Sequence, residues 1–146
     1  MRSPSKMKAM KRCYKPGDQV TYRRRVEAAD TAAFEGRQVH PVYSSFALGR
    51  DAEWCTRQFV LAMKEPEEEG IGTFLYLDHH NPALEGEEVC FTGTVEHFEG
   101  NTLECRFEAH VGARLIASGR TGQKILAQTK LNRLFERLKK SLYHPK

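Results

Sequence analysis

The 146-residue sequence lacks several features that would place it in a class at once. Its four cysteines occur singly, none in a Cys-x-x-Cys or similar spacing, so the sequence predicts no zinc site. No run approaches the roughly 18 consecutive apolar residues of a membrane-spanning helix. The N-terminus is basic without a following apolar run, so we expect no signal peptide, reduced thiols and a cytoplasmic location.

What is present is the composition of one globular domain. Hydrophobic residues make up 40% and charged residues 29% of the chain, and a chain of this length buries a core without disulfides. The formal net charge of +4 favours anionic partners such as a phosphorylated small molecule. Residues 1–15 are basic and aperiodic, and we interpret them as a flexible tail before a single domain at 16–146.

In the first half of the chain, hydrophobic periodicity predicts a strand and then a long helix. Alternating residues predict the strand at 19–27, and residues 38–43 are expected to be extended. The helix is predicted at about 46–64, with Ser44 or Ser45 as its N-cap. One apolar stripe follows the helical spacing and consists of Leu48, Ala52, Cys55, Phe59 and Ala62.

The second half of the chain alternates as an antiparallel sheet does. Strands are expected at 72–78, 87–98, 102–111 and 114–126, and the middle two form a hairpin. A three-residue turn sets apolar residues opposite one another, whereas a two-residue turn mixes apolar with charged positions, so we predict the three-residue register. In neither register are two cysteines cross-strand partners, which argues against a disulfide. The amphipathic segment 128–143 predicts a C-terminal helix.

Two connecting segments complete the predicted architecture. Residues 30–34 predict a short helical turn with Asp30 as N-cap, and the acidic segment 65–70 predicts a solvated loop. The long helix is apolar on a second side as well, at Phe46 and Trp54, which is typical of a helix that the rest of the fold encloses. The class is therefore α+β, and one long helix wrapped by a curved antiparallel sheet is the hotdog arrangement.

Two motifs, HPVYSSFALGRDAEW and GTFLYLDHHNPALEGEEV, carry a family resemblance. In the first, Ser45 and Glu53 stand eight residues apart, at the places of a hydroxyl residue and a helical glutamate. In the second, a count without gaps puts His79 at the place of a catalytic histidine, with His80 as the alternative. With this spacing the chain resembles the fluoroacetyl-CoA-specific thioesterase-like group of the hotdog superfamily, over about residues 16–127.

The resemblance implies hydrolysis of an acyl-CoA or acyl-carrier thioester to a free acid and a thiol, without a cofactor or a metal. Glu53 would be the general base or the nucleophile. His79 would polarise the carbonyl or carry a proton, and Ser45 would hold the water or the carboxylate. The nearby N-terminal end of the helix could hold the oxyanion. The resemblance also implies a homodimer or a dimer of dimers.

The residues themselves leave other interpretations open. Glu53 could be a surface charge paired with Arg50 or Arg57, Ser45 could be only an N-cap, and the two histidines could close a strand end in solvent. A non-catalytic acyl-CoA or ligand-binding hotdog module is the alternative function. A hotdog hydratase or dehydratase ranks third, because no Asp–His pair stands near the main helix. Nucleic-acid binding ranks fourth, since no aromatic-rich RNA-binding signature is present.

Overall fold

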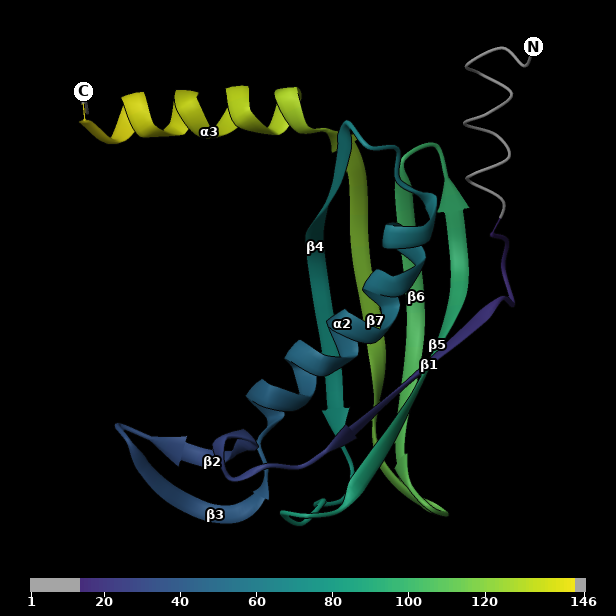
Figure 1. The fold of residues 1–146 in the computed structure, drawn as a ribbon, viewed down its shortest axis with the longest axis vertical. Coiled ribbons are helices and arrows are strands. Elements are labelled where there is room, and N and C mark those ends of the chain that lie inside the picture. Colours follow the sequence, from purple (N-terminus) through teal and green to yellow (C-terminus); the bar gives the residue numbers. More distant parts are fainter. Residues whose placement is uncertain (1–13, 144–146) are drawn as a thin grey trace.

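The chain forms a curved antiparallel sheet around one long helix in the computed structural model, which describes residues 14–143 (Figure 1). The elements in chain order are β1 (Gln19–Arg25), the 3-10 helix η1 (Ala28–Asp30), β2 (Thr31–Phe34), β3 (Arg37–Tyr43), α2 (Ser45–Met63), β4 (Glu68–His79), β5 (Glu88–Glu99), β6 (Thr102–Val111), β7 (Arg114–Ala127) and α3 (Gln128–Tyr143). This arrangement confirms the predicted α+β class.

The main sheet has the strand order β1–β5–β6–β7–β4, with every pairing antiparallel. Its β5–β6 hairpin closes with a two-residue turn, because Glu99 pairs with Thr102. A bulge between Val95 and His97 then shifts the pairing by one residue, so that Val95 lies opposite Cys105. The predicted turn was therefore wrong at the loop itself. The predicted register is confirmed beyond the bulge, which keeps the apolar residues on one face.

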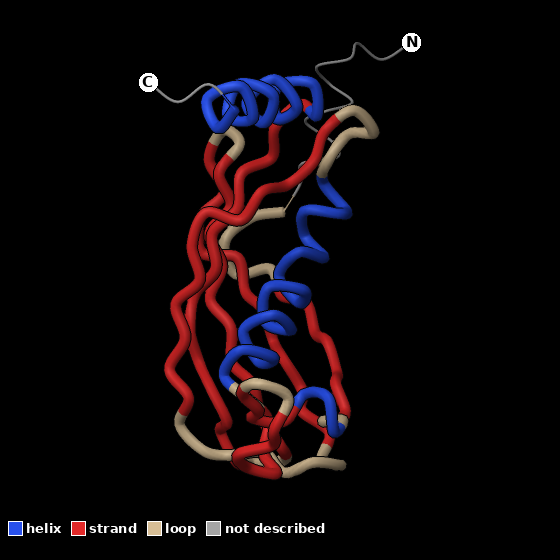
Figure 2. The backbone as a smooth tube through the Cα atoms, turned by 90° about the vertical axis from the view of Figure 1, so that its left-hand side faces the viewer, coloured by secondary structure: helices blue, strands red, loops and turns tan. Residues whose placement is uncertain are grey.

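The helix α2 crosses the concave side of this sheet, and Figure 2 shows the strands curving around it. Ser44 is its N-cap, with a side chain that accepts a hydrogen bond from the backbone N–H of Ala47 at 2.9 Å. The predicted apolar stripe is buried except at its end, where Met63 is buried and Ala62 is exposed. The largest fully buried side chains between helix and sheet belong to Tyr43, Phe59, Phe91, Phe107, Leu48 and Met63.

One side of α2 and one edge of the sheet stay uncovered in the single chain. Phe46 is 87% exposed and Trp54 is 44% exposed, although both are apolar. The strand β4 is an edge strand, and all five residues at 72–76 are exposed. Three large apolar side chains lie in this run: Phe74, Leu75 and Tyr76. An exposed apolar strand edge of this length is a surface on which another strand can pair.

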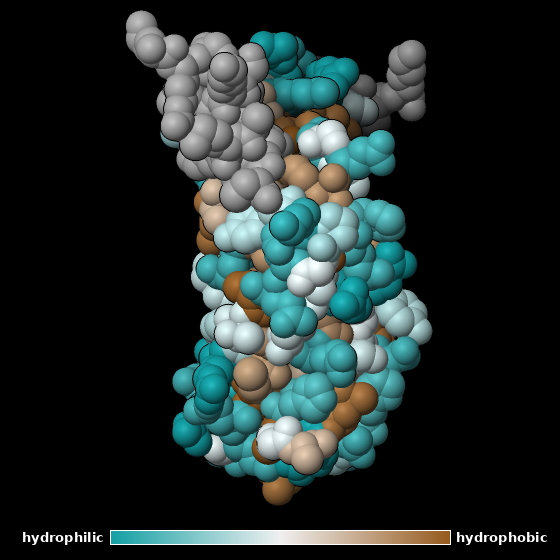
Figure 3. All heavy atoms as spheres, turned by 90° about the vertical axis from the view of Figure 1, so that its right-hand side faces the viewer, coloured by the Kyte–Doolittle hydropathy of each residue, from teal (hydrophilic) through white to brown (hydrophobic). Residues whose placement is uncertain are grey.

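The C-terminal helix α3 has the predicted limits and stands away from the sheet. Figure 1 shows it projecting beyond β4, and within this helix only Leu131 is buried. The rest of the predicted stripe is exposed and consists of Leu134, Phe135, Leu138 and Leu142. The side seen in Figure 3 is mostly hydrophilic with small apolar areas. The apolar surface that the chain leaves open thus includes β4 and α3.

Two connecting segments differ from the prediction. Residues 30–34 do not form a helical turn, because β2 pairs with β3 as a separate two-stranded sheet. Asp30 is the last residue of η1 and not an N-cap; Glu27 is the N-cap, and its N–H donates to the Asp30 carboxylate at 3.0 Å. The acidic segment is a loop only in part, since β4 begins at Glu68, which pairs with Ala127.

The N-terminal residues 1–13 lie outside the described part of the chain, and with them nearly all of the predicted tail and Cys13. Tyr14 packs edge-on against Phe59, with ring centroids 5.1 Å apart. The other three cysteines are free. No helix within the described residues is long and apolar enough to cross a membrane.

Candidate active site

Ser45 and His79 meet at the N-terminal end of α2. Because Ser44 is the N-cap, the hydroxyl of Ser45 is free of that role, and its Oγ lies 3.0 Å from Nδ1 of His79. His79 is the last residue of β4, so the end of this strand meets the start of the helix. A hydroxyl and an imidazole therefore share a hydrogen bond beside the positive end of a helix dipole.

The second ring nitrogen of His79 is unoccupied. Its Nε2 is buried and has no hydrogen-bond partner among the residues that the structure describes. Burial lowers the pKa of His79 below its ordinary value of 6.5, so the ring is neutral at pH 7. His80 is exposed, and its Nε2 lies 2.8 Å from the hydroxyl of Ser118. His79, and not His80, is thus the histidine beside Ser45.

A cavity of about 620 Å³ opens onto Ser45 and His79. Its walls come from η1, the β2–β3 hairpin and the first turns of α2. Most of the other lining residues are apolar, among them Ala32, Ala33, Phe34, Val42, Phe46 and Ala47. An apolar cavity of this size with a few polar groups is typical of a small-molecule site.

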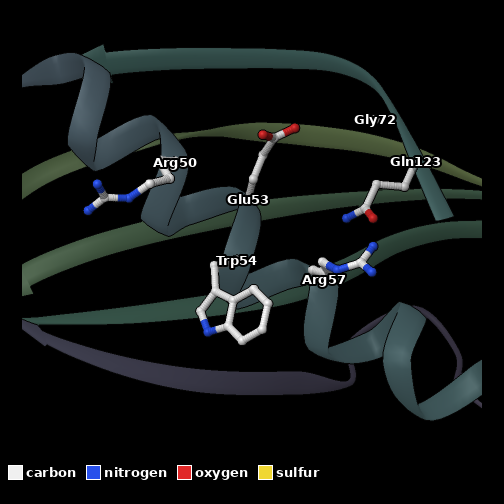
Figure 4. Close-up of a pocket in the computed structure, with 6 residues that line it drawn as sticks. All are labelled: Arg50, Glu53, Trp54, Arg57, Gly72 and Gln123. Carbon is white, nitrogen blue, oxygen red and sulfur yellow. The ribbon is translucent and has the colours of Figure 1, made fainter.

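Glu53 lies about two turns further along α2 and lines a second cavity, of about 270 Å³ (Figure 4). The other lining residues are Arg50, Trp54, Arg57, Gly72 and Gln123. One carboxylate oxygen of Glu53 is 3.0 Å from the place that a Cβ would occupy at Gly72. The carboxylate therefore lies against β4, where only a residue without a side chain leaves room for it.

The arginines near Glu53 are committed to other carboxylates. Arg57 pairs with Glu69 at 2.8 Å, and Arg50 pairs with Asp30 and Asp51, each at 3.0 Å. Glu53 itself is half-buried and has no ion pair within residues 14–143. The pairing expected of a surface charge at this position is therefore absent from the described structure.

Within one chain the three candidate residues do not share a cavity. Ser45 and His79 line the larger cavity and Glu53 lines the smaller one, and Arg50 lines both. Eight residues of helix separate Ser45 from Glu53, a rise of about 12 Å. The single chain therefore assembles a Ser–His pair and, separately, a glutamate.

The strand β4 connects these two places. Its bulge lies between Gly72 and Phe74, so Thr73 is the extra residue and the side-chain alternation shifts by one. As a result Gly72 faces Glu53 of α2, and His79 at the far end of the strand also faces this helix. Without the bulge, two positions seven residues apart would face opposite sides of the sheet.

An ion-pair network that the sequence did not predict borders the larger cavity. Arg24 and Arg50 each reach both Asp30 and Asp51, and the hydroxyl of Tyr43 donates to Asp51. Burial raises the pKa of Asp30, but the hydrogen bonds from a backbone N–H and the two arginines outweigh it and hold this pKa below its usual value. Burial and the neighbouring Asp51 raise the pKa of Tyr43. These contacts tie β1, η1 and β3 to the start of α2.

The cysteines near the site belong to the core. Burial raises the pKa of Cys55 to about 11 and that of Cys105 to about 12, so neither thiol is ionised at neutral pH. This agrees with the interpretation of Cys55 as a core residue. No group of three or more His, Cys, Asp or Glu side chains suited to a metal ion occurs in the described part of the chain.

Comparison with known proteins identifies the family. The family model for the fluoroacetyl-CoA-specific thioesterase FlK matches residues 26–129. This chain belongs to the fluoroacetyl-CoA-specific thioesterase family. The membership confirms the resemblance drawn from the two motifs, and it makes the chain a thioester hydrolase, as predicted.

Solved structures agree with this family and its fold. A hypothetical protein of Thermus thermophilus, described as a thioesterase superfamily member, is 34% identical with a TM-score of 0.83, covering 88% of this chain and 96% of that one. The thioesterase FlK is 22% identical with a TM-score of 0.78, covering 85% and 96%. A hot-dog-like protein of Thermanaerovibrio acidaminovorans is 20% identical with a TM-score of 0.78, covering 85% and 93%. The predicted hotdog fold is therefore confirmed. No curated protein matches the sequence.

Proposed function

We propose that this member of the fluoroacetyl-CoA-specific thioesterase family hydrolyses an acyl-CoA thioester through Ser45, Glu53 and His79. The observation that carries the proposal is the hydrogen-bonded pair of Ser45 and His79, whose free Nε2 stands beside an apolar cavity of about 620 Å³. FlK was solved in complex with fluoroacetate and CoA, which supports a CoA ester as the substrate class. An acyl group on a carrier protein is the alternative substrate.

In the proposed reaction, Glu53 acts on water. Its carboxylate accepts a proton while the water oxygen bonds to the thioester carbonyl carbon; the C–S bond then breaks, and the thiolate sulfur takes up a proton. If Glu53 is instead the nucleophile, its carboxylate attacks first and water hydrolyses the resulting anhydride. Both routes release one acid and one thiol.

His79 and Ser45 would stabilise the carbonyl oxygen. If the Ser45 hydroxyl donates to Nδ1, the neutral ring carries its hydrogen on Nε2 and can donate it to that oxygen. The lowered pKa of His79 keeps this neutral form at pH 7. Backbone N–H groups of the first turn of α2 would add to the stabilisation, because charge develops on the oxygen during the reaction.

The separation of Glu53 from His79 within one chain favours a site shared by two copies. The unpaired edge β4 is the strand along which a second chain can pair antiparallel. A pairing centred on Tyr76 sets Leu75 of one copy opposite Leu77 of the other, and Phe74 opposite Asp78. Leu75 and Leu77 both face α2 in this chain, so opposite residues share a face, as a sheet requires.

The bulge extends this match to the candidate site. Because Thr73 is the extra residue, Gly72 of one copy falls opposite His79 of the second copy. Glu53 lies against Gly72 and would thus stand beside the second copy's His79. We therefore propose a homodimer, or a dimer of dimers, in which each site takes Glu53 from one chain and the Ser45 and His79 pair from the other.

The first test is thiol release from a panel of acyl-CoA esters, from acetyl to long-chain and aromatic, with an acyl-carrier-protein ester as a separate arm. The enzyme's own thiols are blocked beforehand, because Cys90 is partly exposed. Release from at least one ester supports the proposal. Tight acyl-CoA binding without release would instead indicate a non-catalytic ligand-binding module.

The second test distinguishes a shared site from a site within one chain. Glu53→Gln and His79→Ala are co-expressed with different tags, so that mixed dimers form. In a shared site, one of the two sites of each mixed dimer has no substituted residue, and the mixture recovers about a quarter of wild-type activity. Activity that stays at the level of the separate variants would contradict the shared site.

A further inference from the structure

Gln123 on β7 has a buried side chain with no use in the fold. It is 5% exposed, and among residues 14–143 its amide group makes no hydrogen bond. Its neighbour on the same face, Thr121, is equally buried but is paired with the hydroxyl of Thr56 at 2.8 Å. Leaving a buried amide unpaired costs stability, so such a group is retained where it serves a ligand.

This amide lies in the cavity of Glu53. Figure 4 shows the two side chains reaching the cavity from opposite sides, Gln123 from the sheet and Glu53 from α2. Gly72 is the cross-strand partner of Gln123. The Oε1 of Gln123 is 3.4 Å from the place of a Cβ at Gly70, and the carboxylate of Glu53 is 3.0 Å from that place at Gly72. Two glycines therefore keep open the space that the two polar groups border.

The remaining polar side chains of this cavity are engaged elsewhere. Arg57 is held by Glu69, and Arg50 by two buried aspartates. Of the side chains that line the cavity, Glu53 and Gln123 are thus the two with hydrogen-bonding groups left for a small polar ligand. The volume of about 270 Å³ has room for several water molecules.

We propose that Gln123 holds the attacking water against Glu53, an assignment that rests on the proposed function. The Gln123 carbonyl oxygen accepts a hydrogen bond from one water hydrogen, and the Glu53 carboxylate accepts the other hydrogen and then that proton. The water oxygen keeps its lone pair free for the thioester carbon, and Gln123 itself neither gains nor loses a proton. The amide fixes the direction of attack.

The test compares Gln123→Met with Glu53→Gln and the wild type in the thiol-release assay. Methionine has a similar length but cannot hold water, so kcat should fall roughly 10- to 100-fold with KM within about twofold. The midpoint of thermal unfolding should not fall, because the amide makes no hydrogen bond in the described fold. Gln19→Met, a strand glutamine on β1 with its own partner Thr94, is the matched control and should keep full activity.

A double variant separates water holding from a merely structural role. If Gln123 and Glu53 act on one water molecule, Glu53→Gln with Gln123→Met should be no slower than Glu53→Gln alone. Full kcat in Gln123→Met, or losses that multiply in the double variant, would overturn the assignment while wild-type activity leaves the proposed function standing. A wild type that hydrolyses no thioester would overturn both.

Discussion

Replacing Glu53 by glutamine removes the proposed base with little change of shape. The carboxylate has no ion pair in the described structure, so the free energy of unfolding should change by no more than about 0.5 kcal/mol. Loss of a general base lowers kcat by roughly 10²- to 10⁴-fold, which corresponds to about 2.7 to 5.4 kcal/mol in the activation barrier. The amide keeps the side chain against Gly72, so KM should stay nearly constant.

The measurement is thiol release at saturating acyl-CoA, together with thermal unfolding of the same preparation. Glu69→Gln is the matched control, because Glu69 lies near the same cavity but its carboxylate is bound to Arg57. That control loses a half-exposed ion pair, a cost of about 0–1 kcal/mol, and should keep its kcat. Full kcat in Glu53→Gln would refute the assignment of Glu53 as base or nucleophile.

Four further outcomes are expected. His79→Ala should lower kcat about as much as Glu53→Gln, and His80→Ala much less, as measured in the same assay; the reverse order would show that the histidines were misassigned. Because burial lowers the pKa of His79 below 6.5, its ring stays neutral as pH falls through 6.5; the acid limb of kcat/KM should lie below pH 6.5, and stability should decline there because the unfolded chain takes up the proton first. Light scattering should give a mass near twice 16.7 kDa, and Tyr76→Asp, which sets two carboxylates opposite each other, should shift it toward the monomer. Gly70→Ala should destabilise the fold by about 1–3 kcal/mol in urea unfolding, because the new Cβ would lie 2.6 Å from Val60.

Strong periodic segments were predicted well. The helix at 128–143 has the predicted limits, and α2 begins one residue before its predicted start. The segment 30–34 was predicted as a helical turn but forms β2, whose only pairing partner is β3. Four residues are too few for periodicity to decide, so the tertiary partner decides.

The candidate site was predicted as residue types at a spacing, and the two serines show where that method stops. Ser44 and Ser45 are equally good N-caps by sequence, and the backbone at the start of α2 makes Ser44 the cap. Only that choice leaves Ser45 available to His79. Gln123 had no sequence signal, because a single glutamine in an apolar strand becomes notable only when its burial and its missing partner are known.

The sequence by itself determined the α+β class, the long helix, the hairpin and the two motifs, because these depend on periodicity and local spacing. The tertiary structure decided what depends on distant residues meeting: the ion pairs of Asp30 and Asp51, the bulge at Thr73, and the split of Glu53 and His79 between two cavities. Such contacts join positions far apart in the chain. They are fixed by the packing of α2 on the curved sheet, which no local pattern encodes.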